Sequence, residues 1–218
     1  MTAAFGGSLR EELERRPARR LRAGEYLYHV GEAASAVYWV REGLIKTSMV
    51  APDGQVVTLR MHQAGDMLGE LCLSLGERPD QAVGLAESAV VEIPVPLLIA
   101  RFRRDPDAAL DFASAACAHL GHAYERLHSL AVESAIDRLA RTLLDLAADL
   151  GEGPPSRTRL SYRITQEELA RLISARREVV SGLLNQLRSR DCISYGRRGR
   201  IMVDCDALRT LLARSGQV

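Results

Sequence analysis

Residues 164–188 read ITQEELARLISARREVVSGLLNQLR, and this stretch decides how the last third of the chain folds. Thr165 stands directly before an apolar-periodic run, and Glu168 follows three residues later. This pairing is a capping box, which predicts that a helix begins here. After a short break, a second helix is predicted from Arg176 to about Arg190. Two helices joined by so short a turn are typical of a helix-turn-helix.

The second predicted helix has an apolar side and a polar side. The residues expected to form its buried stripe are Val179, Val180, Leu183, Leu184 and Leu187. Two β-rich runs follow at residues 193–195 and 201–203, and an arginine-rich glycine turn at residues 196–200 joins them. A strand pair behind the second helix makes the predicted motif a winged helix-turn-helix.

The charge of the chain is divided unevenly along its length. Residues 155–218 contain 13 arginines, no lysine and 6 acidic residues, a net charge of +7. The other residues carry 16 basic and 22 acidic side chains, a net charge of −6, so the chain's total of +1 conceals the difference. A basic domain of this size indicates a polyanionic partner.

The polar side of the second helix has the chemistry needed to read DNA. A helix fits the major groove, where Arg177 can donate to guanine, Glu178 can accept from cytosine, and Ser181 can reach a base or a phosphate. The wing arginines suit phosphates. The alternative is that this charged face is merely solvated. The residues expected to contact DNA are Thr165, Gln166, Arg176, Arg177, Glu178, Ser181, Asn185, Arg188, Arg197, Arg198 and Arg200.

The first half of the chain has the texture of an all-β domain. Short β-rich runs punctuated by glycine extend from Leu21 to Pro96, which predicts a sandwich or barrel. Asp53-Gly54 lies between two such runs and predicts a hairpin turn, because glycine accepts a positive φ. The runs lie at residues 26–30, 36–40, 45–50, 56–61 and 89–93.

A helical pattern replaces the strand pattern from Asp105 to about Gly151. Its first part carries apolar residues in steps of three and four, the a/d pattern of a heptad seam. Either this helix lies on its own domain, or it forms a two-stranded seam between subunits. A second helix is expected over residues 135–150, followed by a loop at residues 151–155. The residues expected at a dimer interface are Ala113, Ala116, Leu120, Ala123, Leu127 and Leu130.

Together these motifs resemble the Crp/Fnr family of bacterial transcription regulators. The resemblance rests on residues 24–31 (GEYLYHVG), 40–43 (VREG), 65–71 (GDMLGEL), 164–170 (ITQEELA) and 174–181 (SARREVVS). It implies an α+β chain with an N-terminal cyclic-nucleotide-binding-like β-roll (a double-stranded β-helix), a long dimerisation helix and a C-terminal winged helix-turn-helix. The domains are expected at residues 1–104, 105–134 and 135–218. The implied partners are double-stranded DNA, RNA polymerase and a second copy of the chain.

The resemblance further implies a homodimer on a roughly palindromic operator, with half-sites about 34 Å apart. One departure concerns this DNA interface. The family pattern has an arginine after Ser181, whereas this chain has Gly182. The second helix therefore lacks one cation on its reading side, and we expect relaxed specificity at the corresponding base pair.

Other departures concern the effector. Gly69 and Glu70 match the cyclic-AMP cassette, but its Arg-Ser pair falls on Asp80 and Gln81, and the adenine-contacting pair on Ala123 and Tyr124. A carboxylate beside a phosphate is repulsive, so we expect no cyclic-AMP binding. Arg78 could substitute if the loop shifts, whereas Gly69 and Glu70 could serve only as a turn and a helix cap. The expected effector pocket is Arg60, Gly69, Glu70, Leu71, Cys72, Arg78, Asp80, Gln81, Ala123 and Tyr124.

A haem- or redox-based sensor on the same scaffold is the alternative interpretation. In a carbon-monoxide-sensing relative, a thiolate and an imidazole of this loop bind haem; these positions fall on Cys72 and Ser74. His119 and His122 are the alternative imidazole ligands, although they could also be ordinary helix histidines. Residues 1–21 contain no cysteine, which excludes the iron–sulfur sensor of the fumarate–nitrate branch.

Other classes of protein find little support. The four cysteines form no CxxC pair, so neither a zinc site nor a disulfide framework is indicated. A metal-dependent enzyme on a cupin-like barrel would need converging ligands, and the β-rich region offers only His29 and His62. No apolar run reaches the roughly 18–20 residues that span a bilayer, and no secretory signal is evident. We therefore expect a cytoplasmic protein without enzymatic activity.

Overall fold

The computed structural model describes residues 7–196 and 199–215. Its contacts divide the chain into two compact units, with the boundary between Ala123 and Tyr124. This boundary falls inside helix α3 (Pro106–Val132). The expected segments 1–104, 105–134 and 135–218 follow the ends of helices instead, and they stay a prediction.

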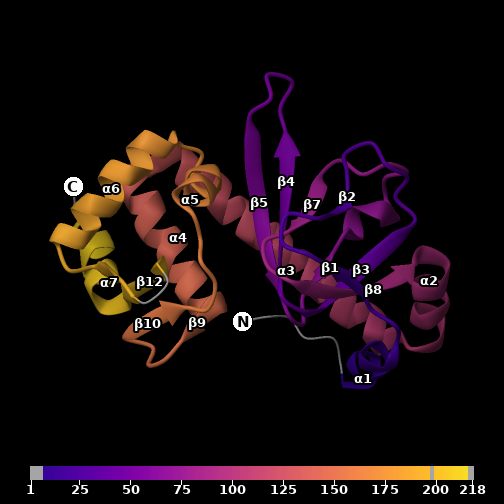
Figure 1. The fold of residues 1–218 in the computed structure, drawn as a ribbon. Coiled ribbons are helices and arrows are strands. Elements are labelled where there is room, and N and C mark those ends of the chain that lie inside the picture. Colours follow the sequence, from indigo (N-terminus) through magenta and orange to yellow (C-terminus); the bar gives the residue numbers. More distant parts are fainter. Residues whose placement is uncertain (1–6, 197–198, 216–218) are drawn as a thin grey trace. The chain divides into compact units, whose positions relative to one another are not determined.

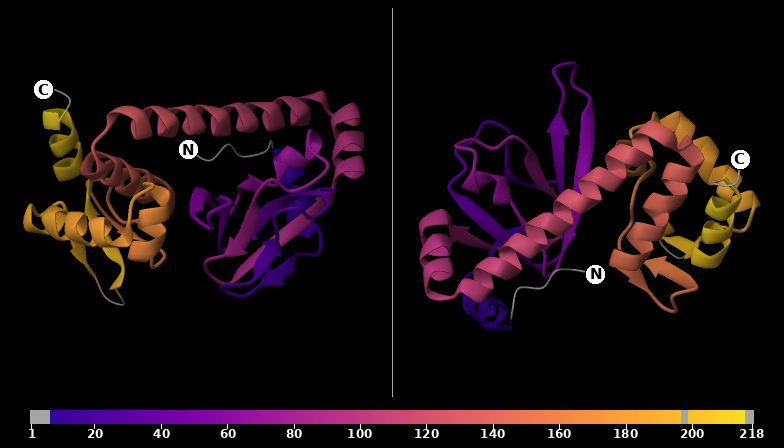
Figure 2. Two further views of the ribbon diagram at one scale, coloured as in Figure 1. Left: turned by 90° about the horizontal axis from the view of Figure 1, so that it is seen from above. Right: turned by 180° about the vertical axis from the view of Figure 1, so that it is seen from behind.

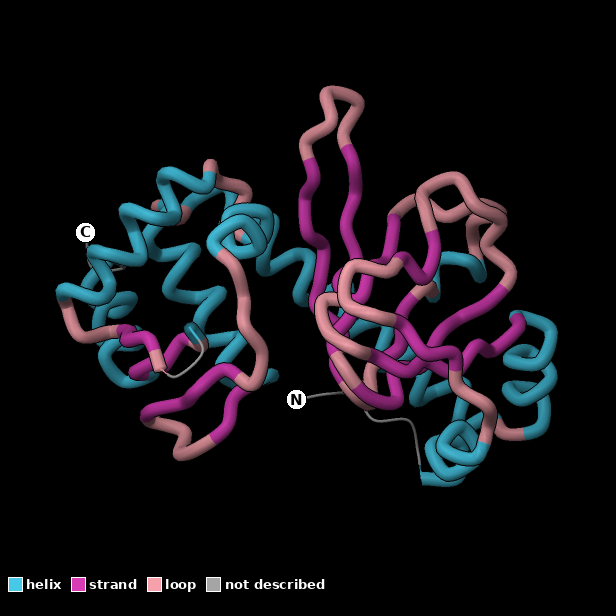
Figure 3. The backbone as a smooth tube through the Cα atoms, in the orientation of Figure 1, coloured by secondary structure: helices cyan, strands magenta, loops and turns pink. Residues whose placement is uncertain are grey.

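The first unit is a β-roll built from two four-stranded antiparallel sheets (Figures 1 and 3). The first sheet has the order β1-β8-β3-β6: β1 (Arg19–Leu21), β8 (Ser88–Pro94), β3 (Ala36–Glu42) and β6 (Met67–Leu68). The second has the order β2-β7-β4-β5: β2 (Tyr26–Tyr28), β7 (Gln81–Gly84), β4 (Leu44–Val50) and β5 (Val56–Gln63). The hairpin between β4 and β5 turns where it was predicted, with Gly54 at a φ of 83°.

Strand β3 separates two apolar cores by simple alternation. Tyr38 and Val40 face the interior of the roll, whereas Val37 and Trp39 belong to a cluster on the other face of the sheet. Successive strand residues point to opposite faces, so a strand buried on both sides must be apolar throughout. Three helices pack against these strand residues and complete the outer cluster: α1 (Gly7–Arg15), α2 (Val95–Arg104) and the start of α3.

The second unit contains the end of α3 and the basic third of the chain. Figure 2 shows α3 as one continuous helix, and Ser134 then caps the next helix by accepting from the backbone N–H of Asp137 at 3.3 Å. A four-stranded sheet of order β11-β12-β10-β9 accompanies the helices. The elements are α4 (Ala135–Leu150), β9 (Gly151–Glu152), β10 (Arg157–Leu160), α5 (Gln166–Leu172), α6 (Arg177–Ser189), β11 (Ile193–Tyr195), β12 (Ile201–Asp204) and α7 (Cys205–Ser215).

This arrangement confirms the α+β fold class, the roll and the winged helix-turn-helix. None of the described helices combines the length and apolar character needed to cross a membrane. Within the described residues, no group of three or more histidine, cysteine or acidic side chains is placed to hold a metal ion.

Candidate functional site

The predicted capping box is present at the start of α5. The hydroxyl of Thr165 accepts from the backbone N–H of Glu168 at 3.2 Å, and the carboxylate of Glu168 accepts from the backbone N–H of Thr165 at 3.0 Å. The Thr165 hydroxyl also donates to this carboxylate at 2.8 Å. The polar groups of Thr165 are therefore occupied by the cap, so its expected contact with DNA stays a prediction.

A tight turn leads from α5 into α6. The N–H of Ala175 reaches back to the carbonyl of Ala170 at 3.0 Å, and Ser174 takes a left-handed conformation with a φ of 52°. This is the geometry of a Schellman-type helix end, where glycine is the usual residue. Arg176 then stands at the N-cap of α6 with its side chain exposed.

Helix α6 presents a polar side to solvent. Its buried stripe consists of Val180, Leu184 and Leu187, with Leu183 half-buried beside it. The prediction that Val179 belongs to this stripe is wrong, because Val179 is 46% exposed. At about 100° per residue, Val179 is turned away from its buried neighbour Val180.

The expected DNA-contacting residues of α6 lie on the exposed side. Arg177, Glu178, Asn185 and Arg188 are exposed, and Ser181 is half-buried. Gly182 lies among them, and a Cβ built on it would meet nothing within 4 Å. The missing side chain therefore leaves an open surface on the helix rather than a packed gap.

The wing is described in part. The N–H of Gly196 donates to the carbonyl of Arg200 at 2.8 Å, which closes the turn between β11 and β12. Arg200 is half-buried, and so is Gln166 on α5. Arg197 and Arg198 lie outside the described residues.

The interior of the roll is occupied by its own polar side chains. Arg78 is only 3% exposed and donates to the carbonyl oxygens of Gly69, at 3.1 Å, and Ala36. Its guanidinium lies 4.3 Å from the ring centroid of Tyr28. Arg78 therefore points inward, where its charge is compensated by carbonyl oxygens and aromatic faces.

Asp80 lies buried in the same interior, at the position where the resemblance implies an arginine. The hydroxyl of Tyr28 donates to its carboxylate at 3.4 Å. Burial raises the pKa of Asp80 above its usual range, against the opposing effects of the Tyr28 hydrogen bond and Arg78. A carboxyl group here offers nothing to attract the phosphate of a cyclic nucleotide.

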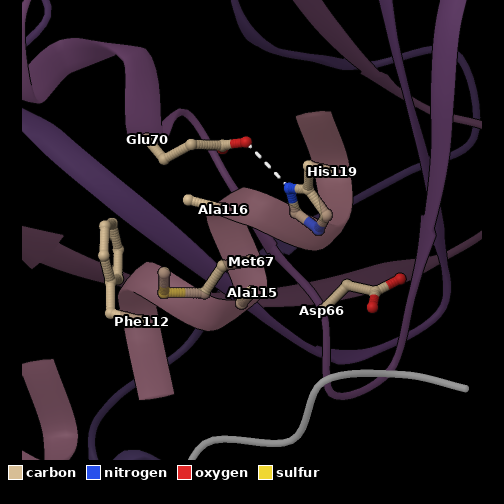
Figure 4. A pocket seen from close by; sticks show the side chains of 7 residues that line it. All are labelled: Asp66, Met67, Glu70, Phe112, Ala115, Ala116 and His119. Atoms are coloured by element: carbon tan, nitrogen blue, oxygen red, sulfur yellow. Dashed lines mark hydrogen bonds and ion pairs between the residues drawn. The ribbon is translucent and has the colours of Figure 1, made fainter. Parts of the chain in front are cut away.

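A small cavity lies between the roll and the first half of α3 (Figure 4). It has room for no more than about one water molecule. Nδ1 of His119 is 3.0 Å from the carboxylate of Glu70. Burial acts to raise the pKa of Glu70, but the hydrogen bonds from His119 and the backbone outweigh it and hold the pKa below its usual range. The lining residues are Asp66, Met67, Glu70, Phe112, Ala115, Ala116 and His119.

The expected effector residues lie in several different surroundings, and the pocket they were expected to form stays a prediction. Of that set, only Glu70 lines the described cavity. Gly69 has a φ of 82° and precedes a short 3-10 helix (Glu70–Leu73), so a role as a turn residue accounts for it. Gln81 donates to Ser48 at 3.3 Å, and Arg60 lies 3.8 Å from Asp66. Leu71, Ala123 and Tyr124 are exposed.

The residues named for the haem alternative lie in the same region. Cys72 is buried in the outer apolar cluster, and burial raises the pKa of its thiol, which disfavours the thiolate that haem requires. His119 is engaged by Glu70, whereas His122 is exposed. The described cavity, with room for no more than about one water molecule, is smaller than haem or a cyclic nucleotide.

The predicted seam on α3 is largely open to solvent. Leu120, Ala123, Leu127 and Leu130 are exposed, as is Ala113, while Ala116 is half-buried at the cavity. Among residues 7–196 and 199–215, nothing covers most of this apolar stripe along the helix.

Sequence reasoning missed Arg126 and Arg138, and it named His119 only as an alternative haem ligand and not as a partner of Glu70. Arg126 and Arg138 donate to backbone carbonyl oxygens at the end of α5, and His119 meets Glu70 across the cavity. Guanidinium-to-carbonyl contacts leave no residue pattern in a sequence. The helical spacing did place Phe112, Ala115 and His119 on one side of α3, a signal that could have indicated the roll-facing side.

Comparisons with known proteins match both halves of the chain. A family model of the cyclic nucleotide-binding domain matches residues 18–105, and one of the Crp-like helix-turn-helix domain matches residues 137–211. The Anaerobic regulatory protein of Bacillus subtilis is 26% identical over 188 residues, which cover 85% of this chain and 79% of the relative.

A second relative is the CRP-like cAMP-activated global transcriptional regulator of Mycobacterium tuberculosis. It is 26% identical over 186 residues, covering 85% of this chain and 83% of the relative. The solved structure of FixK2 from Bradyrhizobium japonicum superposes with a TM-score of 0.80 at 20% identity, covering 89% of this chain and 96% of that one. At this identity the FixK2 likeness supports the fold alone.

Proposed function

Because the chain belongs to the Crp/Fnr family of DNA-binding transcription regulators, we propose that it works as a homodimer on a roughly palindromic operator. The observation that carries this proposal is α6, whose polar side is exposed and which follows the capped helix α5 in the basic third of the chain. Its two copies would enter successive major grooves about 34 Å apart. DNA as the target implies a cytoplasmic protein, with RNA polymerase as a further partner.

The apolar stripe on α3 supports the dimer. Leu120 and Leu127 are half or more exposed, and fully burying a leucine side chain contributes roughly 1.5–3 kcal/mol. Small residues at Ala113, Ala116 and Ala123 would let two such helices approach closely. We therefore assign this stripe to the contact between two copies of the chain.

Base recognition falls mainly to Arg177 and Glu178 in the first turn of α6. Both side chains are exposed and suit the edges of a G·C pair. Ser181, Asn185 and Arg188 continue the same side, and Arg176 and the wing arginines would contact phosphates. Gly182 reaches neither a base nor a phosphate, so the base pair opposite it is read with little specificity.

The roll does not respond to cyclic AMP in this proposal. The support is the buried Asp80 at the expected phosphate position, together with the inward-pointing Arg78. The Mycobacterium relative is named as cAMP-activated and the Bacillus relative is not, so similarity alone carries no effector across. Titration calorimetry with cyclic AMP is expected to show no binding, and an affinity in the micromolar range would overturn this part.

DNA recognition is tested by selection from a pool of random duplexes. We expect enriched sequences with an inverted repeat and, by fluorescence anisotropy, a loss of roughly 1–3 kcal/mol in Arg177→Ala on the selected site. The matched control is Arg209→Ala, which removes an exposed arginine from α7. An equal loss on selected and random DNA would reduce Arg177 to a phosphate contact, and no binding at low salt would overturn the function.

The dimer is tested by Leu127→Asp against Leu110→Asp. Both leucines lie on α3 and both are 66% exposed, but Leu110 lies outside the seam. Light scattering is expected to show a dimer for the unmodified protein and Leu110→Asp, and a monomer for Leu127→Asp. A monomeric unmodified protein would contradict the assignment of the stripe.

A further inference from the structure

The end of α5 is held by two arginines from other helices. Nη2 of Arg126, near the end of α3, donates to the carbonyl of Leu172 at 2.7 Å and more weakly to that of Arg171 at 3.4 Å. Nε of Arg138, in the first turn of α4, donates to the carbonyl of Ile173 at 3.1 Å. Three successive carbonyls therefore receive guanidinium groups, all within the second compact unit.

These contacts provide hydrogen-bond donors for the carbonyl groups at the end of α5. The last carbonyls of a helix have no partner within the helix, and they carry the negative end of its dipole. Helix α5 has only seven residues, so these carbonyls are a large part of it. Burial lowers the pKa of Arg126, but an arginine remains charged at neutral pH, and its forked donors can serve two carbonyls at once.

The connection between α3 and α4 is fixed by the same side chains. Arg138 also donates through Nη1 to the carbonyl of Glu133 at 2.8 Å, so one guanidinium joins this connection to the end of α5. The carboxylate of Glu133 accepts from Arg141 and from the hydroxyl of Ser129. The hydrogen bond from Arg141 holds the pKa of Glu133 below its usual range, so this carboxylate is ionised at neutral pH.

We propose that Arg126 and Arg138 are positioning residues that set the direction of the recognition helix α6 relative to α3. The inference rests on the proposed function, since α3 carries the dimer seam and α6 reads DNA. In a dimer, the direction of α6 relative to α3 determines the distance between the two recognition helices. The two arginines thereby determine the half-site spacing that the protein accepts.

The packing of α6 separates this role from simple folding. Its buried stripe, Val180, Leu184 and Leu187, contacts the unit independently of the two arginines. The turn between the helices consists of only a few residues with a left-handed Ser174, and its direction follows the end of α5. Loss of the arginines leaves the apolar core in place but frees the turn to adopt other directions.

The test uses the selected operator and two derivatives in which the half-sites are moved apart or together by one base pair. The unmodified protein is expected to bind the derivatives much more weakly than the operator. Arg126→Gln is expected to bind the operator roughly ten- to a hundredfold more weakly and to lose most of this discrimination. Arg138→Gln should act in the same direction, and Arg126→Lys should restore part of the preference.

The control Arg209→Gln should leave affinity and spacing preference unchanged, because Arg209 pairs with Asp206 on the surface of α7. Circular dichroism and light scattering establish that each variant is folded and dimeric. If Arg126→Gln does not fold, the measurement is made on Arg126→Lys and Arg138→Lys. A variant that keeps the unmodified spacing preference overturns the inference, whereas failure of the unmodified protein to bind DNA overturns the proposed function instead.

Discussion

The buried side chain of His62 makes the stability of the roll depend on pH between about pH 7.5 and about pH 5. The residue lies on β5 and is only 3% exposed, with Nε2 3.1 Å from the hydroxyl of Thr47. Burial lowers its pKa from 6.5 to about 3, Arg60 and His119 add to this effect, and Glu70 opposes it. The folded protein therefore keeps His62 neutral at pH values where the unfolded chain binds a proton.

The sign follows from this difference. Above the unfolded pKa of 6.5 both states are neutral at this residue and stability is unaffected. Below pH 6.5, His62 is protonated in the unfolded chain but stays neutral in the folded roll. The free energy of unfolding therefore falls as the pH falls, by up to about 1.4 kcal/mol per pH unit. Between about pH 7.5 and about pH 5, His62 alone is expected to cost about 2 kcal/mol.

Urea unfolding at the two pH values measures this cost. Trp39 is the chain's single tryptophan and is buried in the outer apolar cluster of the first unit, so its fluorescence reports unfolding of that unit. His62→Gln is expected to lose about 2 kcal/mol less than the unmodified protein on acidification. His29→Gln, which removes an exposed histidine of the same unit, should behave like the unmodified protein. The same loss in His62→Gln and the unmodified protein would refute the reasoning.

Three glycine-related substitutions should change stability in directions fixed by the backbone. Ser174→Gly relieves a left-handed residue with a φ of 52° and should raise the stability of the helix-rich unit by about 1 kcal/mol in thermal unfolding, whereas unchanged stability would contradict the strain. Gly182→Ala should raise it by up to about 1 kcal/mol, since its Cβ meets open space; destabilisation would show a hidden contact. Gly43→Ala should destabilise the roll by at least about 2 kcal/mol in urea unfolding. Gly43 has a φ of 97°, and a Cβ on it would lie 2.3 Å from the Ser88 hydroxyl oxygen. An unchanged free energy of unfolding would refute this clash.

Much of the fold was predictable because local pattern and tertiary role agree in it. The capping box at Thr165 and the strand runs at residues 36–40 and 45–50 form in the structure where the pattern indicated. The short strands β1, β6, β7, β9 and β10 were not anticipated, because they are two to four residues long and lack the continuous apolar or β-branched run that marked β11 and β12.

Some residues of the candidate site could likewise be predicted from the sequence, and others could not. The exposed side of α6 follows from helical geometry, so Arg177 and Glu178 could be found from spacing. The inward direction of Arg78 and its stacking on Tyr28 depend on residues 50 positions apart and on a loop whose path the sequence does not specify. Val179 was misplaced for another reason, because its apolar character indicated burial while its angular position on the helix did not.

Strand β3 is apolar on both faces, and helix α1 covers the outer face. Leu9 and Leu13 of α1 pack beside Val37 and Trp39, and Arg41 fastens the helix by donating to the carbonyl of Leu13 at 2.9 Å. A shortened chain that lacks α1 would present a β-rich hydrophobic surface to its neighbours during synthesis. Such surfaces promote aggregation, so the yield of intact protein in a cell would depend on this helix.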